Sequence, residues 1–333
     1  MSHELDFTKG RAAIAYRGDT PWHGYGEEME PDMTQEQWLH AAGMDYEVLE
    51  QPISFKRPSD IPTMTPHYQA IEGKKALVRS DTYDVLSVVS DQYKVVQPDE
   101  VLAFFKTLVD EQGFEMHTAG VLADGKRVWA LAQTGLEYSI DGKDPLAAYL
   151  LLATSYDGKF STTAQFTSIR VVCNNTLSWS LNAGENQTNG IVKIPHVSEF
   201  VPSFVKDELG LLEGGWDEFT KDITALSKIR ISDREALDFF LYVLNTTEEE
   251  VLQGAQLINM KKLISFYESA PGATLVTAKG TLWGAVNAVT FLCDHARRAR
   301  NAGMRFNSTS FGASARLKAR AFQQAKFLAG IEA

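Results

Sequence analysis

The pattern of hydrophobic and polar residues changes its period within one stretch, Leu150–Leu181, which is the most informative part of the chain. An apolar run leads to Asp157-Gly158, a pair suited to the positive φ values of a tight hairpin turn. Residues 160–166 then alternate apolar and polar side chains, as a half-buried strand does. Over 168–181 the apolar residues recur at helical spacing behind a Thr-Ser pair that can cap a helix. The stretch therefore predicts a β-hairpin followed by a helix.

The rest of the N-terminal half also mixes strands with helices. Turn residues and alternation predict about four consecutive antiparallel strands over 114–166. Two more strands are expected at 76–79 and 84–89, and Gln97-Pro98 begins a helix after them. Because strands and helices are segregated rather than alternating, the fold class expected is α+β, with an antiparallel sheet of four or more strands plus helices.

The C-terminal half is expected to be mainly helical. Capping boxes begin two helices, at Ser232–Glu235 and at Thr247–Glu250, and the second helix is expected to run to Pro271-Gly272. A further helix is expected over 281–300, with a cationic last turn that suits the helix dipole. A basic amphipathic helix over 311–328 completes the pattern.

The first 75 residues are rich in Pro, Gly and charged residues. They predict one short helix, Thr34–Ala42, and a loop over 52–66 that contains four prolines. A polar loop at 184–190 is the best boundary further along the chain. Three segments are therefore expected: an irregular segment over 1–75, an antiparallel α+β core over 76–183, and a helical region over 191–333.

The composition, 44% hydrophobic and 23% charged, is that of an ordinary soluble globular protein. No secretory signal or membrane span is evident, so we expect a cytoplasmic protein. Cys173 and Cys293 both lie in apolar patterns, which favours buried free thiols over a disulfide. The net charge is −11, yet residues 260–333 hold 11 Lys and Arg against 3 Asp and Glu. This basic segment is expected either to bind an anion or to dock on the acidic body.

The sequence contains none of the common catalytic motifs. It has no phosphate-binding GxxxxGK[ST] or GxGxxG, no CxxC pair, no HExxH and no GxSxG. Seven histidines are scattered, so a zinc site would need residues from distant parts of the chain. We therefore expect no cofactor and find no positive case for an enzyme.

Polar and basic residues near the hairpin and on the last helices are the candidates for contacts with a polyanion. Tyr156 is the candidate for stacking on a base, and the others are candidates for contacting phosphates, although Arg297 and Arg298 would also suit a solvated helix end. The full set is Tyr156, Lys159, Arg170, Asn174, Arg297, Arg298, Arg316 and Arg320.

Several runs of residues together resemble a known family. They are PWHG at 21–24, TSYDG at 154–158, IRVVCNNTL at 169–177 and GTLWGAVNAVT at 280–290. In this order, over most of the chain, they resemble domain-of-unknown-function family 932, whose members are encoded by phages and plasmids. The resemblance implies a mobile-element origin and a role in a bacterial host, and it implies no activity. The hairpin and its predicted helix are also similar in outline to the core of phage annealing proteins of the RecT and Red-beta type.

These observations lead to one main hypothesis and two alternatives. The main hypothesis is an oligomeric protein of phage or plasmid DNA metabolism that binds and anneals single-stranded DNA without bond chemistry. It predicts that Arg170→Ala weakens DNA binding and reduces the slope of log affinity against log salt concentration by about one unit. The alternatives are a protein-binding module that acts on a host defence or replication factor, and a metal-dependent nuclease that a chelator would inactivate.

Overall fold

The computed structural model describes residues 10–18, 26–30, 33–57, 67–172, 175–177, 191–205, 213–299 and 302–331. The chain divides into two compact units. Unit 1 contains Met1–Ala132, Leu151–Ala164 and Lys193–Phe204. Unit 2 contains Gln133–Leu150, Gln165–Val192 and Val205–Ala333.

Unit 1 begins with short strands and two helices. In chain order its elements are β1 (Ile14–Tyr16), β2 (Glu27–Glu28), α1 (Gln35–Ala41), β3 (Val48–Arg57), β4 (His67–Arg79), β5 (Val85–Ser90), α2 (Pro98–Gln112) and β6 (Glu115–Leu122). The short helix expected over Thr34–Ala42 is confirmed as α1, and Thr34 forms a capping box with Gln37 at its start.

Four strands have residues in both units, and a further strand and the later helices belong to unit 2. The shared strands are β7 (Arg127–Ile140), β8 (Asp144–Ser155), β9 (Thr162–Arg170) and β11 (Ile191–Ile194). Unit 2 adds β10 (Asn175–Leu177), α4 (Glu213–Lys228), α5 (Asp233–Leu244), α6 (Glu248–Leu252), α7 (Leu257–Ser269), α8 (Leu282–Phe291), the π-helix η1 (Leu292–Ala296), α9 (Ala302–Ser310) and α10 (Ala313–Leu328).

The strands form an eight-stranded, mostly antiparallel sheet and a three-stranded sheet. The larger sheet has the order β10-β9-β8-β7-β6-β1-β2, with β11 also paired to β9, and the smaller has the order β3-β4-β5. Among the described pairs, β1 is antiparallel to β6 and parallel to β2. The predicted α+β class, with N-terminal sheets and a C-terminal helical region, is confirmed.

The predicted hairpin is confirmed. The prediction of a helix over 168–181 is wrong, because the described residues of this segment form strands and a turn. Strand β9 continues to Arg170, and β10 returns antiparallel beside it, with Thr176 opposite Ile169. Residues 178–181 lie outside the described part of the chain. The local helical spacing does not decide this segment, because β-branched residues suit a strand and the edge of β9 offers backbone partners.

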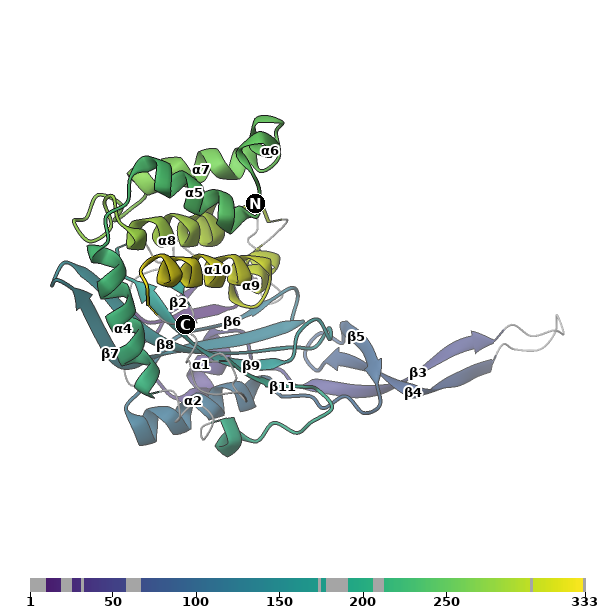
Figure 1. The fold of residues 1–333 in the computed structure, drawn as a ribbon. Helices are drawn as coiled ribbons and strands as arrows, with labels where there is room; N and C mark the ends of the chain where they lie inside the picture. The colour runs from purple at the N-terminus through teal and green to yellow at the C-terminus, as the bar shows by residue number, and fades with distance from the viewer. Residues whose placement is uncertain are drawn as a thin grey trace. The chain divides into compact units, whose positions relative to one another are not determined.

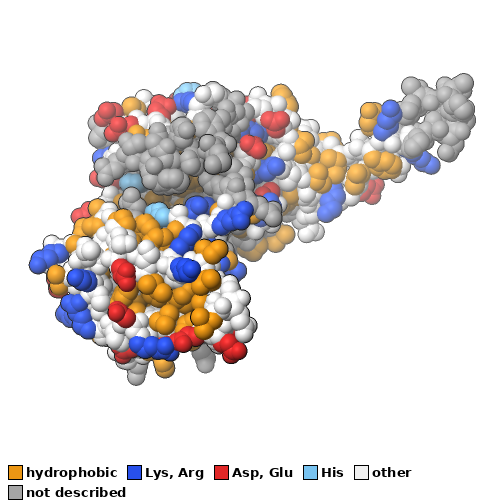
Figure 2. All heavy atoms as spheres, turned by 90° about the horizontal axis from the view of Figure 1, so that it is seen from above, with side chains coloured by type: hydrophobic (Ala, Val, Ile, Leu, Met, Phe, Trp, Pro, Cys, Tyr) orange, Lys and Arg blue, Asp and Glu red, His pale blue; other side chains and the backbone are white. Residues whose placement is uncertain are grey.

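Strand β3 replaces the first part of the loop expected over 52–66, and residues 58–66 lie outside the described part of the chain. Strand β4 follows from His67 and pairs with β3. Pro52 is compatible with a strand because the pairing shifts register between Pro52 and Ser54, where a ladder hydrogen bond is not required. Strand β5 pairs with β4 only from Lys74 to Val78. Residues 67–70 of β4 therefore pair with β3 alone. This part of β3 and β4 is a two-stranded ribbon that projects from unit 1 (Figures 1 and 2).

Helix α8 is the centre of the helical region. It contacts α4, α5, α7 and α10, and Figure 1 shows it between α5 and α7 on one side and α10 on the other. Every residue from Leu282 to Thr290 is buried. Gly284 allows this packing, because a Cβ there would lie 1.9 Å from the carbonyl oxygen of Ala278.

The predicted C-terminal helices exist, although two of them are interrupted. Both predicted capping boxes are confirmed, at Ser232 on α5 and at Thr247 on α6. The helix expected to run to Pro271 is divided into α6 and α7, because Gln256 adopts a left-handed conformation. The helix expected over 281–300 changes to the π-helix η1 at Leu292 and ends at Ala296. The helix expected over 311–328 is confirmed as α10, and α9 before it was not predicted.

Candidate nucleic-acid interface

The two predicted residues of the hairpin turn have different surroundings within unit 1. Tyr156 is completely buried, and its hydroxyl donates a hydrogen bond of 3.0 Å to the carbonyl oxygen of Val96. Burial raises its pKa well above the ordinary value. The ring therefore packs within the fold and presents no face to a base. Lys159 is exposed, and its ammonium lies 3.3 Å from the carboxylate of Asp157.

Arg170 is buried in unit 2, with a side chain that is 2% exposed. Its guanidinium donates two hydrogen bonds to Asp144, from Nε to Oδ1 at 2.6 Å and from Nη2 to Oδ2 at 2.7 Å. Asp144 is fully buried and also accepts from Thr277 Oγ1 at 2.9 Å and from Trp283 Nε1 at 3.1 Å. This bidentate pair joins β8 and β9 to the start of α8, so Arg170 acts in folding and not at a surface.

The remaining predicted residues lie on or near the last helices, except that Asn174 lies outside the described part of the chain. Arg316 and Arg320 are exposed on α10. Arg320 donates a hydrogen bond of 3.3 Å to the carbonyl oxygen of Val243 at the end of α5. These two arginines are therefore available at the surface of unit 2.

Arg297 and Arg298 lie together at a cavity of about 270 Å³ between the end of η1, α9 and the first turn of α10. Arg305 on α9 lines the same cavity, so three guanidinium groups share one site. Arg298 is exposed, whereas Arg297 and Arg305 are half-buried. We call this site the arginine pocket.

Hydrogen bonds within unit 2 hold two of the three arginines in place. Arg297 Nη1 donates to Ser314 Oγ at 3.3 Å, and Arg305 Nη1 donates to the carbonyl oxygen of Asp294 at 3.4 Å. Ser308 Oγ in turn donates to Ser314 Oγ at 2.9 Å. Each guanidinium has five N–H donors, so most of these donors remain available for a ligand.

The polar side chains that line the arginine pocket are cations, hydroxyls and one thiol. Burial raises the pKa of the Cys293 thiol to about 12, so it carries no charge at neutral pH. No Asp or Glu is among the described lining residues. The carboxylate of the adjacent Asp294 instead accepts hydrogen bonds from Lys318 and from Thr176. The pocket therefore presents uncompensated positive charge, which favours an anion.

Helix α10 adds a smaller contribution of the same sign. Its first turn, with Ala313 and Ser314, lines the arginine pocket, and the Ser314 N–H donates a hydrogen bond of 3.3 Å to Ser308 Oγ. The N–H groups at the beginning of a helix carry partial positive charge and favour anions. This effect supports the arginines and would not define a site without them.

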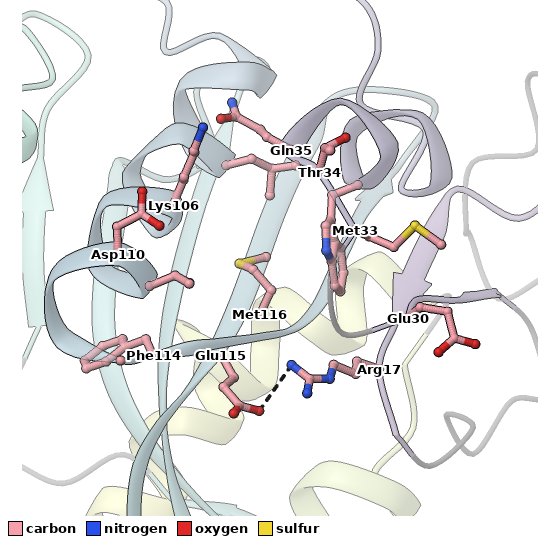
Figure 3. A pocket seen from close by; sticks show the side chains of 14 residues that line it. Arg17, Glu30, Met33, Thr34, Gln35, Lys106, Asp110, Phe114, Glu115 and Met116 are labelled. Carbon is pink, nitrogen blue, oxygen red and sulfur yellow. Dashed lines mark ion pairs between the residues drawn. The ribbon is translucent and has the colours of Figure 1, made fainter.

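Unit 1 contains a larger cavity of about 660 Å³ with a different character (Figure 3). Its lining includes apolar side chains such as Trp38 and Met116, between α1, α2 and β6. Both signs of charge surround them, and Arg17 forms an ion pair of 3.2 Å with Glu115 at one edge. Mixed charge gives this cavity no preference for an anion.

Sequence reasoning identified Arg297 and Arg298 but missed Arg305 and the serines of the pocket. Arg305 lies in the basic C-terminal segment, but no other basic residue is its neighbour in the sequence. Only the fold of α9 against η1 places it beside the other two. In the described residues, no group of three His, Cys, Asp or Glu side chains could hold a metal ion. None of the helices in that part of the chain has the length and apolar character of a membrane span.

One comparison with known proteins agrees with the sequence resemblance, and two find no match. No curated protein and no solved structure matches the chain. The family model DUF932, described as a domain of unknown function, matches residues 85–312. This match extends from β5 to the turn before α10 and includes Arg297, Arg298 and Arg305. Because it covers more than half of the chain, the protein belongs to the DUF932 family.

Proposed function

We propose that this protein binds single-stranded DNA and promotes its annealing without bond chemistry, and that the arginine pocket holds backbone phosphates. The observation that carries the proposal is the convergence of Arg297, Arg298 and Arg305 on one cavity whose described lining has no carboxylate. Guanidinium groups bind phosphate in a bidentate manner, and an annealing protein needs only such contacts and accessible bases.

The charge distribution supports a confined path for the DNA. Residues 260–333 carry 11 basic and 3 acidic residues, while the whole chain has a net charge of −11. A polyanion is therefore attracted to the C-terminal helices, whereas the remainder of the chain is acidic on average. Exposed Arg316 and Arg320 on α10 extend the positive charge beyond the pocket. Annealing further implies several copies side by side, so we propose a homo-oligomer.

The test is fluorescence anisotropy with a labelled single strand of about 40 nucleotides, measured over a series of salt concentrations with a duplex of the same sequence for comparison. We expect salt-dependent binding that prefers the single strand. Replacing Arg298 and Arg305 with Gln should weaken it and reduce the salt slope by about 0.7 for each phosphate that the variant no longer neutralises.

Arg234→Gln is the matched control, because Arg234 is an exposed arginine of unit 2 that pairs with Asp238 and Glu248 away from the pocket. Each single substitution of an arginine by Gln changes the net charge equally, so only a site-specific effect separates the control from the pocket variants. Equal slopes for the control and the pocket variants would refute the site.

Other outcomes identify the alternatives. Absence of binding at low salt would refute the DNA hypothesis and leave the basic helices as a surface for a host protein. Cleavage of the strand that a chelator abolishes would indicate a nuclease instead. If binding is found, mixing complementary labelled strands measures annealing directly, and the pocket variants should slow it.

A further inference from the structure

The outer part of the β3–β4 ribbon is exposed on both faces. Four residue pairs form it, from Ser54 opposite Ala70 to Arg57 opposite His67. All described side chains over 54–57 and 68–74 are exposed. An isolated two-stranded ribbon is at best marginally stable in water, because it has no third layer to cover its side chains. A ribbon that covers no core of its own is therefore suited to contact a partner.

The exposed side chains of the ribbon include two aromatic and two basic residues. Tyr68 is 72% exposed and Phe55 is 46% exposed, and Lys56 and Arg57 are exposed between them. Figure 2 shows hydrophobic side chains along the ribbon, with Lys and Arg side chains among them. Both rings are accessible to a ligand, and the register of the ladder decides which face each of them occupies.

The register distributes these residues evenly between the two faces. Residues directly opposite each other in a ladder share a face, and neighbours along a strand alternate. Lys56 is paired with Tyr68, so one face carries a cation and an aromatic ring side by side. Phe55 and Arg57 are two residues apart in β3 and lie together on the other face. Each face therefore offers one ring and one positive charge.

The charge of the ribbon identifies the class of partner. The paired segments 54–57 and 67–70 contain Lys56 and Arg57 and no acidic residue, in a chain of net charge −11. The ribbon is thus a local positive element of an acidic protein, and it complements a polyanion. Rings that stack on bases, combined with cations that contact phosphates, are the means by which proteins bind single strands without sequence preference.

We propose that the β3–β4 ribbon is a nucleic-acid-binding arm that holds single-stranded DNA. Tyr68 and Phe55 stack on bases, and Lys56 and Arg57 contact phosphates. This inference rests on the proposed function and adds to it a second contact, located in unit 1 and separate in sequence from the arginine pocket. It supplies the stacking residues that the buried Tyr156 does not supply.

The experiment measures the affinity of the full-length protein for the labelled single strand with Tyr68→Ala, Phe55→Ala and the double variant. We expect each substitution to weaken binding by about fivefold or more, and Tyr68→Phe to restore it, because base stacking requires the ring and not the hydroxyl. Tyr83→Ala is the matched control, because Tyr83 is 74% exposed on the turn between β4 and β5. The control should bind as the unaltered protein does.

Photo-crosslinking provides a second readout that does not depend on the stability of variants. A strand that contains 5-iodouracil is irradiated with the unaltered protein, and the adducts are identified by mass spectrometry. Adducts on Tyr68 or Phe55 support the arm. Crosslinks only to the C-terminal helices, with Tyr68→Ala binding as Tyr83→Ala does, overturn the arm and leave the arginine pocket in place.

Two further outcomes are also decisive. If the unaltered protein binds no single strand, the proposed function fails and the arm fails with it. If the arm variants keep their affinity for DNA but change the sedimentation of the protein, the ribbon is a self-association element and the arm is refuted.

Discussion

Replacing Asp144 with Asn removes the counter-charge of a buried guanidinium. The carboxylate of Asp144 accepts two hydrogen bonds from Arg170, one from Thr277 and one from Trp283, at 2.6 to 3.1 Å. All four contacts to the carboxylate come from donors. An Asn side chain has one acceptor oxygen, and its NH₂ group would face donors at the other position. The variant therefore loses both the charge pair and part of the hydrogen bonding.

The magnitude follows from the burial of both partners, which are 0% and 2% exposed. Removing one partner of a buried ion pair costs about 3–5 kcal/mol, because the other charge remains without compensation. That is a large part of the roughly 5–15 kcal/mol that stabilises a typical domain. At about 2–4 °C for each kcal/mol, the melting temperature of Asp144→Asn should fall by roughly 6–20 °C.

The assay is denaturant unfolding followed by tryptophan fluorescence, for Asp144→Asn, Arg170→Gln and the double variant. A neutral Asn–Gln pair leaves no buried charge, so the double variant should be more stable than the sum of the single effects indicates, by about 2 kcal/mol. Asp238→Asn, which removes one acid from the exposed pair with Arg234, should change stability little.

A stability of Asp144→Asn within about 1 kcal/mol of the unaltered protein would refute this reasoning. So would additive single effects, since the pair would then not be coupled. The same geometry bears on DNA binding. We expect Arg170→Ala to lower stability and to leave the salt slope of DNA binding unchanged. A folded Arg170→Ala protein with a flatter slope would instead support the phosphate contact expected from the sequence.

Two other substitutions test the packing of each unit. In unit 2, Gly284→Ala should destabilise the protein by about 3 kcal/mol or more in thermal unfolding, because the new Cβ meets the carbonyl oxygen of Ala278. Adding Ala278→Gly leaves that carbonyl in place, so recovery of stability in the double variant would contradict this explanation. In unit 1, burial lowers the pKa of His196, whose Nε2 lies 3.0 Å from the carbonyl oxygen of Phe160. Its neutral form is favoured in the folded state, so stability should decrease as the pH falls from about 6.5 towards the lower folded pKa, and this decrease should be smaller in His196→Gln. Denaturant midpoints at pH about 7.5 and 5.5 measure it, and an equal pH dependence in both proteins would count against the assignment.

The sequence by itself determined the features that depend on near neighbours. The capping boxes at Thr34, Ser232 and Thr247 were predictable because cap and partner are three residues apart. The hairpin between β8 and β9 and the α+β class followed from turn residues and from the period of the apolar positions. The same level of information identified the basic C-terminal segment and the two adjacent arginines, Arg297 and Arg298.

Only the tertiary structure decided what depends on residues far apart in the chain. Ile169 and Thr176 show helical spacing, yet they face each other in a strand pair, because the edge of a sheet offers hydrogen bonds that a local pattern does not reveal. Arg170 looked like a phosphate contact until the fold placed Asp144 beside it. Arg305 became part of a site only when α9 packed against η1. In each case, burial and pairing between distant segments outweigh the preferences of the local sequence.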